Sequence, residues 1–451
     1  MVKSSGLREP EFHGADFVHD SAPSGHAASG TVPGRLREPA IRGRISFPSV
    51  HPNLAGPSIT GDEILYHPQM VKAMRALRRC MSPLGLQGIA LAGILLALPS
   101  SSSAAPRKLD LNARIEKECG PPGYRVDSGC RVELGGGTFT ISETVRLGSC
   151  TATTVRNSVI LEGRSAGMLA SVPRFPTAGT TLQWKGPEGG TMFEVCGASF
   201  LSFRDLTLDA AGAGIGIRMS ADNAASAISH FVELRNVVIN GAAVGVYVTG
   251  RNYADQVDFV TLERVSLSNV GTGYLQDSQQ SVVGRLETVE VTARSRGFVI
   301  RNGSLSCESC YVGALPPGKA SLGDFIAFHL TRGSEPAKPW EAHHQIQIED
   351  SHMELDRGTF IVEDAGAHFP ITLIGNSYSL QCSTPGCEMR VVDSNSRAPI
   401  VMIGDVIQAS SNPPARPKAR ICHRGPDLIH LGVHKKPEVS ELIWGCAQTA
   451  Q

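Results

Sequence analysis

The sequence predicts an all-β solenoid, in which short coils of three strands stack on one another. One observation is a recurring two-strand unit, in which apolar and polar residues alternate on both sides of a single polar corner residue. A second is a further short apolar strand that follows each unit after a small or polar turn. A third is composition, because 48 glycines and only 6% aromatic residues suit tightly turning strands with small and branched side chains inside.

The two-strand unit is clearest in "FVELRNVVIN", which begins at Phe231 and has its corner at Asn236. Its repeats lie roughly 20 to 40 residues apart, which is the period of solenoid coils. An antiparallel sandwich is the alternative, and the lack of regular Asn-Gly hairpins between the strands disfavours it. The residues expected at or beside the corners are Asp205, Asn236, Arg264, Thr288, Ser309, Asp350, Asn376 and Asp405.

The additional strand reads "VGVYVTG" from Val244, "RGFVIRN" from Arg296 and "GTFIVED" from Gly358. A single coil of this kind cannot bury its apolar face alone, so we expect successive coils to stack over one continuous core. In the coil that begins at Phe231, the alternation predicts that the core residues are Val232, Leu234, Val237, Ile239, Val246 and Val248.

These units resemble the coils of the right-handed parallel β-helix of the pectate-lyase-like superfamily, over about Asn157 to Gln408. The segment "LDLNARIEKEC" from Leu109 is similar to the N-terminal cap of that family, a short amphipathic helix that covers the open end. "VELGGGTFTIS" would then start the first coil. The resemblance implies a cap and first coil at 105–156, the parallel β-helix at 157–409, and a Pro-rich linker with a disulfide-held C-terminal cap at 410–451.

Residues 70–104 have the build of a secretory signal peptide. Lys72, Arg75, Arg78 and Arg79 form a basic region, Gly85 to Leu98 is apolar, and small residues precede a cleavage site after Ala104. The apolar run is shorter than the ~20 residues of a membrane span, which disfavours the alternative of a signal anchor. We therefore expect a secreted or periplasmic protein without a stable membrane span. Residues 1–69 are polar and aperiodic, and we expect them to be disordered or a mis-called extension before a start at Met70 or Met74.

The cysteines also indicate an oxidising compartment. Cys80 stands alone, whereas the other ten occur as near neighbours, which favours local disulfides. Zinc is the weaker reading of the C-x-x-C at residues 307–310, because no second C-x-x-C follows at zinc-ribbon spacing. Proximity suggests the pairs Cys119–Cys130, Cys382–Cys387 and Cys422–Cys446. The remaining four cysteines are Cys150, Cys196, Cys307 and Cys310.

The charge balance disfavours a nucleic-acid partner, since Lys+Arg and Asp+Glu both number 42. The resemblance instead implies a polysaccharide lying over the sheet of third strands, walled by the loops that follow it. No cofactor is expected, and nothing in the sequence supports a calcium site. The residues that alternation turns outward on that sheet are, in stacking order, Arg218, Tyr247, Asp277, Arg301, His329 and Glu363.

Two reactions fit such residues. A glycoside hydrolase needs two carboxylates ~5–9.5 Å apart, and Asp277 and Glu363 are separated by several coils. Asp324 with Glu363, or Asp277 with Asp255, would be closer. A lyase needs a base for the proton α to a uronate carboxylate and a cation for that carboxylate, for which Arg301, His329, Arg332 and Lys338 are available. The candidate catalytic residues are Asp277, Arg301, His329 and Glu363.

The longest loop, Thr331 to Gln345, follows His329 and holds Trp340, whose ring could stack on a sugar. A metal at Glu341, His343 and His344 is disfavoured, because adjacent histidines on a strand point to opposite sides. The candidate substrate-binding residues are Arg218, Tyr247, Trp340 and His343.

The catalytic signatures of polygalacturonases and pectate lyases are absent from the chain. The resemblance therefore implies the fold without a catalytic site, and fold alone does not decide function. We expect a polysaccharide lyase or glycoside hydrolase. The alternative is a non-catalytic carbohydrate-binding, adhesion or structural β-helix protein.

Overall fold

The structure is a computed structural model that describes residues 105–121, 129–151, 156–164, 179–225, 227–250, 254–315, 324–333, 344–355, 358–381, 388–409 and 416–446. All of these residues belong to one compact unit, Leu96–Gln451. The expected signal peptide and residues 1–69 lie outside the described residues. Within the described part of the chain, no helix combines the length and the apolar character that crossing a membrane requires.

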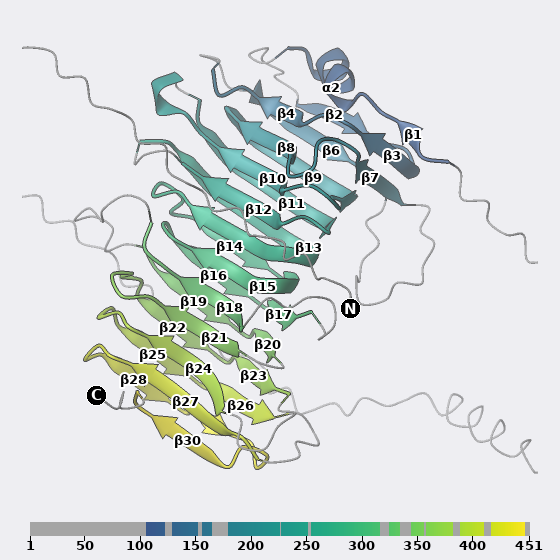
Figure 1. Ribbon diagram of the computed structural model, residues 1–451. Helices are drawn as coiled ribbons and strands as arrows, with labels where there is room; N and C mark the ends of the chain where they lie inside the picture. The colour runs from purple at the N-terminus through teal and green to yellow at the C-terminus, as the bar shows by residue number, and fades with distance from the viewer. Residues whose placement is uncertain are drawn as a thin grey trace, which may run out of the picture. The chain divides into compact units, whose positions relative to one another are not determined.

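The strands stack in three parallel sheets, and each strand pairs with the equivalent strands one coil earlier and one coil later (Figure 1). For example, β16 (Leu305–Glu308) pairs in parallel with β14 (Gly284–Glu287) and β19 (Ile346–Glu349). Such pairing requires the chain to return to the same sheet after every coil, and connections between parallel strands are right-handed almost without exception. The chain is therefore a right-handed parallel β-helix, as the sequence predicted.

The first sheet contains the strands before the corner: β2 (Cys130–Glu133), β5 (Arg156–Asn157), β6 (Val159–Glu162), β14, β16, β19, β22 (Ile371–Ile374), β25 (Ile400–Ile403) and β28 (Leu428–Leu431). The second sheet contains the strands after it: β1 (Arg107–Lys108), β3 (Gly137–Ile141), β7 (Thr180–Trp184), β17 (Tyr311–Ala314), β20 (His352–Leu355), β23 (Ser377–Leu380), β26 (Val406–Ala409) and β29 (His434–Lys435).

The third sheet contains β4 (Val145–Gly148), β8 (Thr191–Cys196), β10 (Ile215–Ser220), β12 (Val244–Thr249), β18 (Phe325–Leu330), β21 (Gly358–Glu363), β24 (Glu388–Ser394), β27 (Lys418–His423) and β30 (Glu441–Trp444). Four long strands bend and join more than one sheet: β9 (Ala198–Asp209), β11 (Ser229–Asn240), β13 (Val257–Asp277) and β15 (Glu290–Ile300). A short 3-10 helix, η1 (Asn223–Ala225), follows β10.

The corners between the first two sheets have the left-handed backbone that a sharp turn requires. Asn236 has φ 51°, its Nδ2 donates to Asp205 Oδ1 (3.0 Å), and its Oδ1 accepts from Arg264 Nε (2.7 Å). The stacked corner side chains thus bond from coil to coil. In later coils Gly375 and Gly404 take the positive φ instead. The predicted corner residues with positive φ are Asp205, Asn236, Arg264, Thr288, Ser309 and Asp350, whereas Asn376 and Asp405 follow a corner glycine.

Substitutions at Asn236 should separate the side-chain bonds from the backbone strain. Asn236→Gly tolerates positive φ but loses two hydrogen bonds, so we expect the free energy of unfolding to fall by about 1–2 kcal/mol. Asn236→Ala also places a Cβ in the left-handed region, which should cost about 1 kcal/mol more. Denaturant unfolding of both variants measures the difference, and equal stabilities would contradict the strain argument.

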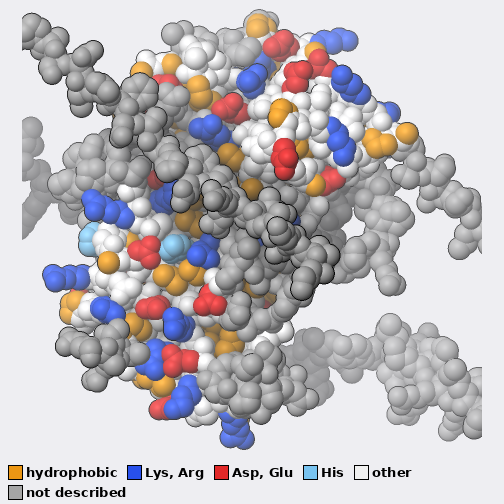
Figure 2. Space-filling view, viewed as in Figure 1, with side chains coloured by type: hydrophobic (Ala, Val, Ile, Leu, Met, Phe, Trp, Pro, Cys, Tyr) orange, Lys and Arg blue, Asp and Glu red, His pale blue; other side chains and the backbone are white. Residues whose placement is uncertain are grey.

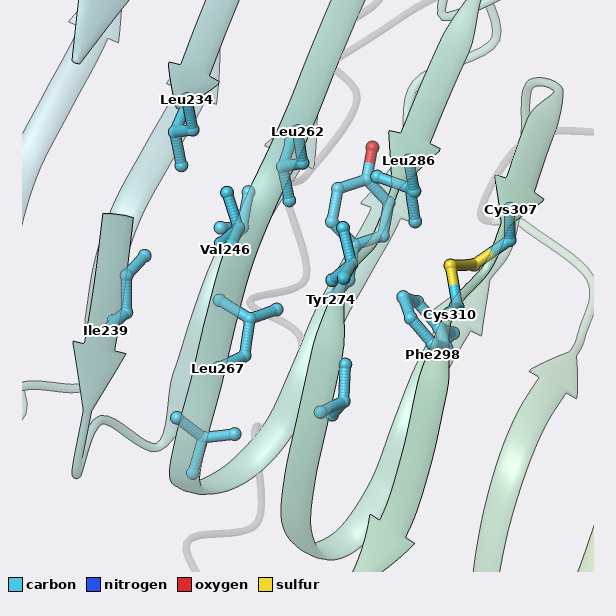
Figure 3. Packing of buried hydrophobic residues seen from close by; sticks show 14 of the residues in the cluster. Leu234, Ile239, Val246, Leu262, Leu267, Tyr274, Leu286, Phe298, Cys307 and Cys310 are labelled. Carbon is cyan, nitrogen blue, oxygen red and sulfur yellow. A yellow bond between two sulfur atoms is a disulfide. The ribbon is translucent and has the colours of Figure 1, made fainter. Parts of the chain in front are cut away.

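The core lies between the sheets, and one row of it is visible in Figure 3, where Leu234, Leu262 and Leu286 come from successive coils. Phe298 stacks on Phe328 of the next coil with ring centroids 4.6 Å apart. Such aligned, dry rows stabilise each coil against its neighbours. The six core residues predicted from the coil at Phe231 are all fully buried: Val232, Leu234, Val237, Ile239, Val246 and Val248.

The N-terminal end of the stack carries the predicted amphipathic helix, α2 (Leu111–Cys119). Asp110 caps it by accepting a hydrogen bond from Ala113 N (2.9 Å). Leu111, Ile115 and Cys119 are buried, and the helix lies beside β2 and β4 (Figure 1). At the other end, β27 and β30 continue the third sheet, so the stacking extends beyond residue 409 to Trp444.

Four disulfides join cysteines 3 to 46 positions apart among the described residues: Cys119–Cys130, Cys150–Cys196, Cys307–Cys310 and Cys422–Cys446. The first and last confirm two of the pairs expected from proximity, and Cys382–Cys387 lies outside the described residues. Cys307 and Cys310 are bonded to each other (Figure 3), which excludes a zinc-binding role for this disulfide-bonded pair. The bonded state suits an oxidising compartment.

Candidate functional site

The outward face of the third sheet carries a row of side chains, one from each coil. The register aligns Arg218, Tyr247, Leu275, Val299, His329, Val362 and Asp393 in that order. The row is polar at its ends and apolar around Leu275, Val299 and Val362. His329 therefore stands between two aliphatic side chains, on the face where the sequence placed it.

His329 is paired with a carboxylate. Its Nε2 lies 3.0 Å from Oδ2 of Asp364, the residue that follows β21. The His329 side chain is 22% exposed and that of Asp364 42% exposed, so both are open to solvent. A carboxylate in this position holds the imidazole in one orientation. The pair has the features of a general base that is oriented by a carboxylate.

A second pair lies on the neighbouring coils. The Arg301 guanidinium lies 3.4 Å from Asp277 Oδ2, and Asn302 Nδ2 donates to Asp277 Oδ1 (2.8 Å). Asp277 occupies an outward position beside Thr249, yet it is only 9% exposed because these two partners cover it. The Arg301 side chain remains 42% exposed. Asp277 thus holds a guanidinium that faces solvent.

The two pairs are close along the sheet. Val299 lies directly beside His329, and Arg301 is two residues further along the same strand direction. With ~4.8 Å between strands and ~3.3 Å per residue, the Cα atoms of His329 and Arg301 are about 8 Å apart. A base and a cation at this spacing can contact neighbouring atoms of one sugar residue.

Glu363 does not lie on the outward face of the third sheet, and the outward orientation predicted for it is wrong. It is fully buried in an inward row with Ile300 and Leu330. The prediction failed because it assigned a charged residue to the surface, whereas the groups that hydrogen-bond to Glu363 lie inside the coil. Ser394 Oγ donates to Glu363 Oε2 (2.7 Å), and the backbone N–H of Phe369 donates to Oε1 (3.2 Å).

The buried carboxyl group is part of a chain of polar groups across three coils. Ser394 Oγ also lies 3.1 Å from Nδ1 of His423, the next residue in the inward row. Burial raises the pKa of Glu363 to about 7, against the lowering effect of its hydrogen bonds, and the charge of Asp364 raises it further. Burial also lowers the pKa of His423. Both groups are therefore favoured in their neutral forms.

Asp277 and Glu363 cannot act as a pair of hydrolytic carboxylates. The register separates them by three coils, or about 14 Å, and Glu363 is inaccessible. The closer acids named from the sequence do not form a hydrolytic pair either. Asp255 is buried, and Asp324 precedes β18, at the opposite end of that strand from His329.

The candidate substrate-binding residues are spread along the row. Arg218, whose Nη1 lies 3.8 Å from Glu194 Oε1, is four coils from His329, or about 19 Å. Tyr247 is three coils away. Only a polymer could contact them together with His329. Trp340 and His343 lie outside the described residues, as do Lys338 and Glu341. His344 is described and buried, with Nε2 3.1 Å from the Gln279 carbonyl oxygen.

Sequence reasoning missed Asp364 and Asn302, the partners of His329 and Asp277. Each adjoins a residue that was selected, since "VED" ends at Asp364 and "IRN" ends at Asn302. Only the lengths of the intervening turns place them against residues 35 and 25 positions away. In the described ranges, no group of three His, Cys, Asp or Glu side chains is arranged to hold a metal ion. Figure 2 shows acidic and basic side chains interspersed over the visible face.

Comparison with protein-family models and with curated proteins gives no match. Among solved structures, the chain is similar to the A-module of the mannuronan C-5 epimerase AlgE6 from Azotobacter vinelandii, with 14% identity, TM-score 0.39 and coverage of 72% of this chain and 94% of that one. It is also similar to the DFA-IIIase of Arthrobacter chlorophenolicus A6 without its lid, with 12% identity, TM-score 0.43 and coverage of 77% and 98%. The parallel pairing of its strands, with right-handed connections from coil to coil, makes the fold of the chain a right-handed parallel β-helix.

Proposed function

We propose that this is a secreted or periplasmic protein that acts on a polysaccharide containing uronate units, by removing the proton α to the carboxylate. The observation that carries the proposal is the solvent-facing His329–Asp364 pair beside the Asp277-held guanidinium of Arg301. The long outward row suits a polymeric substrate, and the disulfides suit the compartment.

Each residue has a distinct task in the reaction. His329 accepts the C5 proton, and Asp364 keeps the imidazole oriented and stabilises its charge. Arg301 binds the uronate carboxylate, where negative charge grows as the proton leaves. The electron pair of the broken C5–H bond then forms the C4=C5 double bond as the C4–O bond breaks. The leaving oxygen recovers a proton from the His329 imidazolium or from water.

The lyase reaction is favoured over hydrolysis because the carboxylates beside His329 and Arg301 are both engaged by these neighbours. Asp277 is covered by Arg301 and Asn302, and Asp364 is engaged by His329. A non-catalytic binding protein would keep Arg301 as a carboxylate ligand without using His329 as a base, so the two roles can be separated by measurement.

The purified protein should release unsaturated, ultraviolet-absorbing uronate products from uronic-acid polysaccharides and leave neutral ones intact. Arg301→Ala should lower this activity about 10²-fold or more, because the carboxylate loses its cation. Arg285→Ala is the matched control, since Arg285 is an exposed arginine of the first sheet that pairs with Glu287 (3.0 Å). Binding of uronate polymers without any product would indicate a binding protein, and release of reducing ends without unsaturation would indicate a hydrolase.

A further inference from the structure

A groove crosses the outward face of the second sheet, whereas His329 lies on the third sheet. It has a volume of about 880 Å³ and is lined by residues of β7, β9, β11, β13, β15 and β17, together with Leu315 just after β17. This volume is in the range of ligand-binding clefts. Nothing in the proposed reaction uses it.

The groove is recessed, as the burial of its outward side chains shows. Val238 faces outward in the row that runs from Thr207 through Val238 and Ser266 to Glu290, yet it is only 9% exposed. A second outward row runs from Asp209 through Asn240 and Ser268 to Thr292, and Ser268 is also buried. Burial raises the pKa of Glu290 as well. An ordinary solvated sheet face would leave such side chains open.

The backbone is irregular where it borders the groove. Asn269, in β13, has φ 54° and lines the groove, and the pairing of β13 with β15 shifts register on both sides of Val270. A bulge of this kind redirects a side chain and costs conformational energy, and bulges are frequent next to functional sites. Arg294 Nη2 approaches the Asn269 side chain to 3.5 Å without itself lining the groove.

The lining groups define the ligand chemistry. Asp209 and Glu290 are the charged residues among the described lining residues, and both are acidic, so an anionic polymer would be repelled. The other polar groups are hydroxyls and amides, such as Thr292 and Asn240, and Tyr311 lines the groove on β17. The sheet backbone is already paired on both sides, which rules out a peptide adding as a strand. A neutral ligand rich in hydroxyl groups fits this lining.

The spacing indicates an elongated ligand that is bound rather than cleaved. The lining strands follow at ~4.8 Å, so the six of them span about 24 Å. Asp209 and Glu290 are three coils apart, about 14 Å, which is beyond the separation that glycoside hydrolysis requires. Asp209 is moreover held by Gln183 Nε2 (3.0 Å).

We propose that this groove binds a neutral oligosaccharide or polysaccharide chain, as a second carbohydrate site distinct from the uronate-acting face. The hydroxyl and amide groups of successive coils would bond to successive sugar residues, with Asn269 turned in by the bulge. The protein would then hold a neutral glycan on one sheet while acting on an acidic glycan at another.

Calorimetric titration of the purified protein with neutral hexasaccharides of β-linked glucose, mannose and xylose, and of α-linked glucose, tests the proposal. At least one should bind, and a mannuronate hexamer should not bind at this groove. The double variant Asn269→Gly, Thr292→Val should lower the affinity for the neutral ligand about tenfold, because it removes two hydrogen-bonding side chains. Gly tolerates the positive φ at 269, which protects the fold.

The matched control is Thr372→Val, which removes an outward threonine hydroxyl from the first sheet, in β22. It should leave binding unchanged, as should Arg301→Ala. Thr207→Val, at another lining position of the groove, is the second variant if the double variant loses more than a few degrees of melting temperature, and it should weaken binding several-fold. Failure of all neutral hexamers to bind, or binding indifferent to both groove variants, overturns the proposal. The proposed function is tested separately, by the loss of uronate-directed activity in Arg301→Ala. A failure of the neutral-glycan site can therefore be told apart from a failure of the proposed function.

Discussion

Replacement of His329 by glutamine should lower the rate of product formation from a uronate polysaccharide by about 10²–10⁴-fold. Glutamine keeps a polar group near Asp364 but cannot take up a proton, so the loss should appear in kcat with little change in KM. Initial rates of unsaturated-product formation measure both parameters.

Two further variants sharpen this test. His434→Gln is the control, because His434 is an exposed histidine of β29 on the second sheet and should be dispensable. His329→Ala leaves space at the base position, and added imidazole should restore part of its activity. Full activity in His329→Gln would remove His329 from the mechanism, whereas inactivity without imidazole rescue, together with a lowered melting temperature, would assign it a structural role.

The free energy of unfolding should fall by roughly 3 kcal/mol between about pH 4.5 and about pH 7 because of Glu363 alone. Burial raises the pKa of this carboxyl from its ordinary 4.5 to about 7 in the folded protein. Between those values the folded chain binds a proton that the unfolded chain has released, so rising pH favours unfolding. The stabilisation is fully present below about pH 4.5 and is lost by about pH 7.

Glu363→Gln should flatten this dependence, since an amide keeps the size of the acid and does not titrate. Thermal melts at pH 5 and pH 8 should show the variant near the parent at pH 5 and several degrees above it at pH 8. Glu308→Gln, at an exposed position of β16, should melt in parallel with the parent. Parallel behaviour of Glu363→Gln would show that the carboxyl is not held neutral. Asp405→Asn should act similarly at lower pH, because burial raises the pKa of Asp405 to about 6.

The sequence was informative wherever apolar and polar residues alternate without interruption. In β11 and β12 every predicted core residue is buried, because only the core-facing side of a strand is favourable for an aliphatic side chain. The corner at Asn236 was equally readable, since a small amide tolerates positive φ and bonds to the corners above and below. Near-neighbour cysteines were also readable, because residues a coil or less apart lie within bonding reach.

Alternation misled where a polar residue lies inside. Glu363 was assigned to the surface, yet Ser394, 31 residues later, satisfies its carboxyl group. Asp277 was placed on the outward face as a catalytic candidate, yet Asn302 and Arg301 cover it. The burial of a charged group depends on its partners, and those partners come from other coils. The recessed groove at Asn269 had no sequence signal, because a bulge shifts the register that the pattern assumes.

The sequence by itself determined the architecture of this protein: parallel coils with a helix at the N-terminal end and near-neighbour disulfides. These follow from local patterns, which repeat in every coil and need no knowledge of other coils. Only the tertiary structure decided which polar groups meet, such as His329 with Asp364 and Arg301 with Asp277. The physical reason is that unequal turn lengths set the alignment of neighbouring coils, and hydrogen bonds of about 3 Å depend on that alignment.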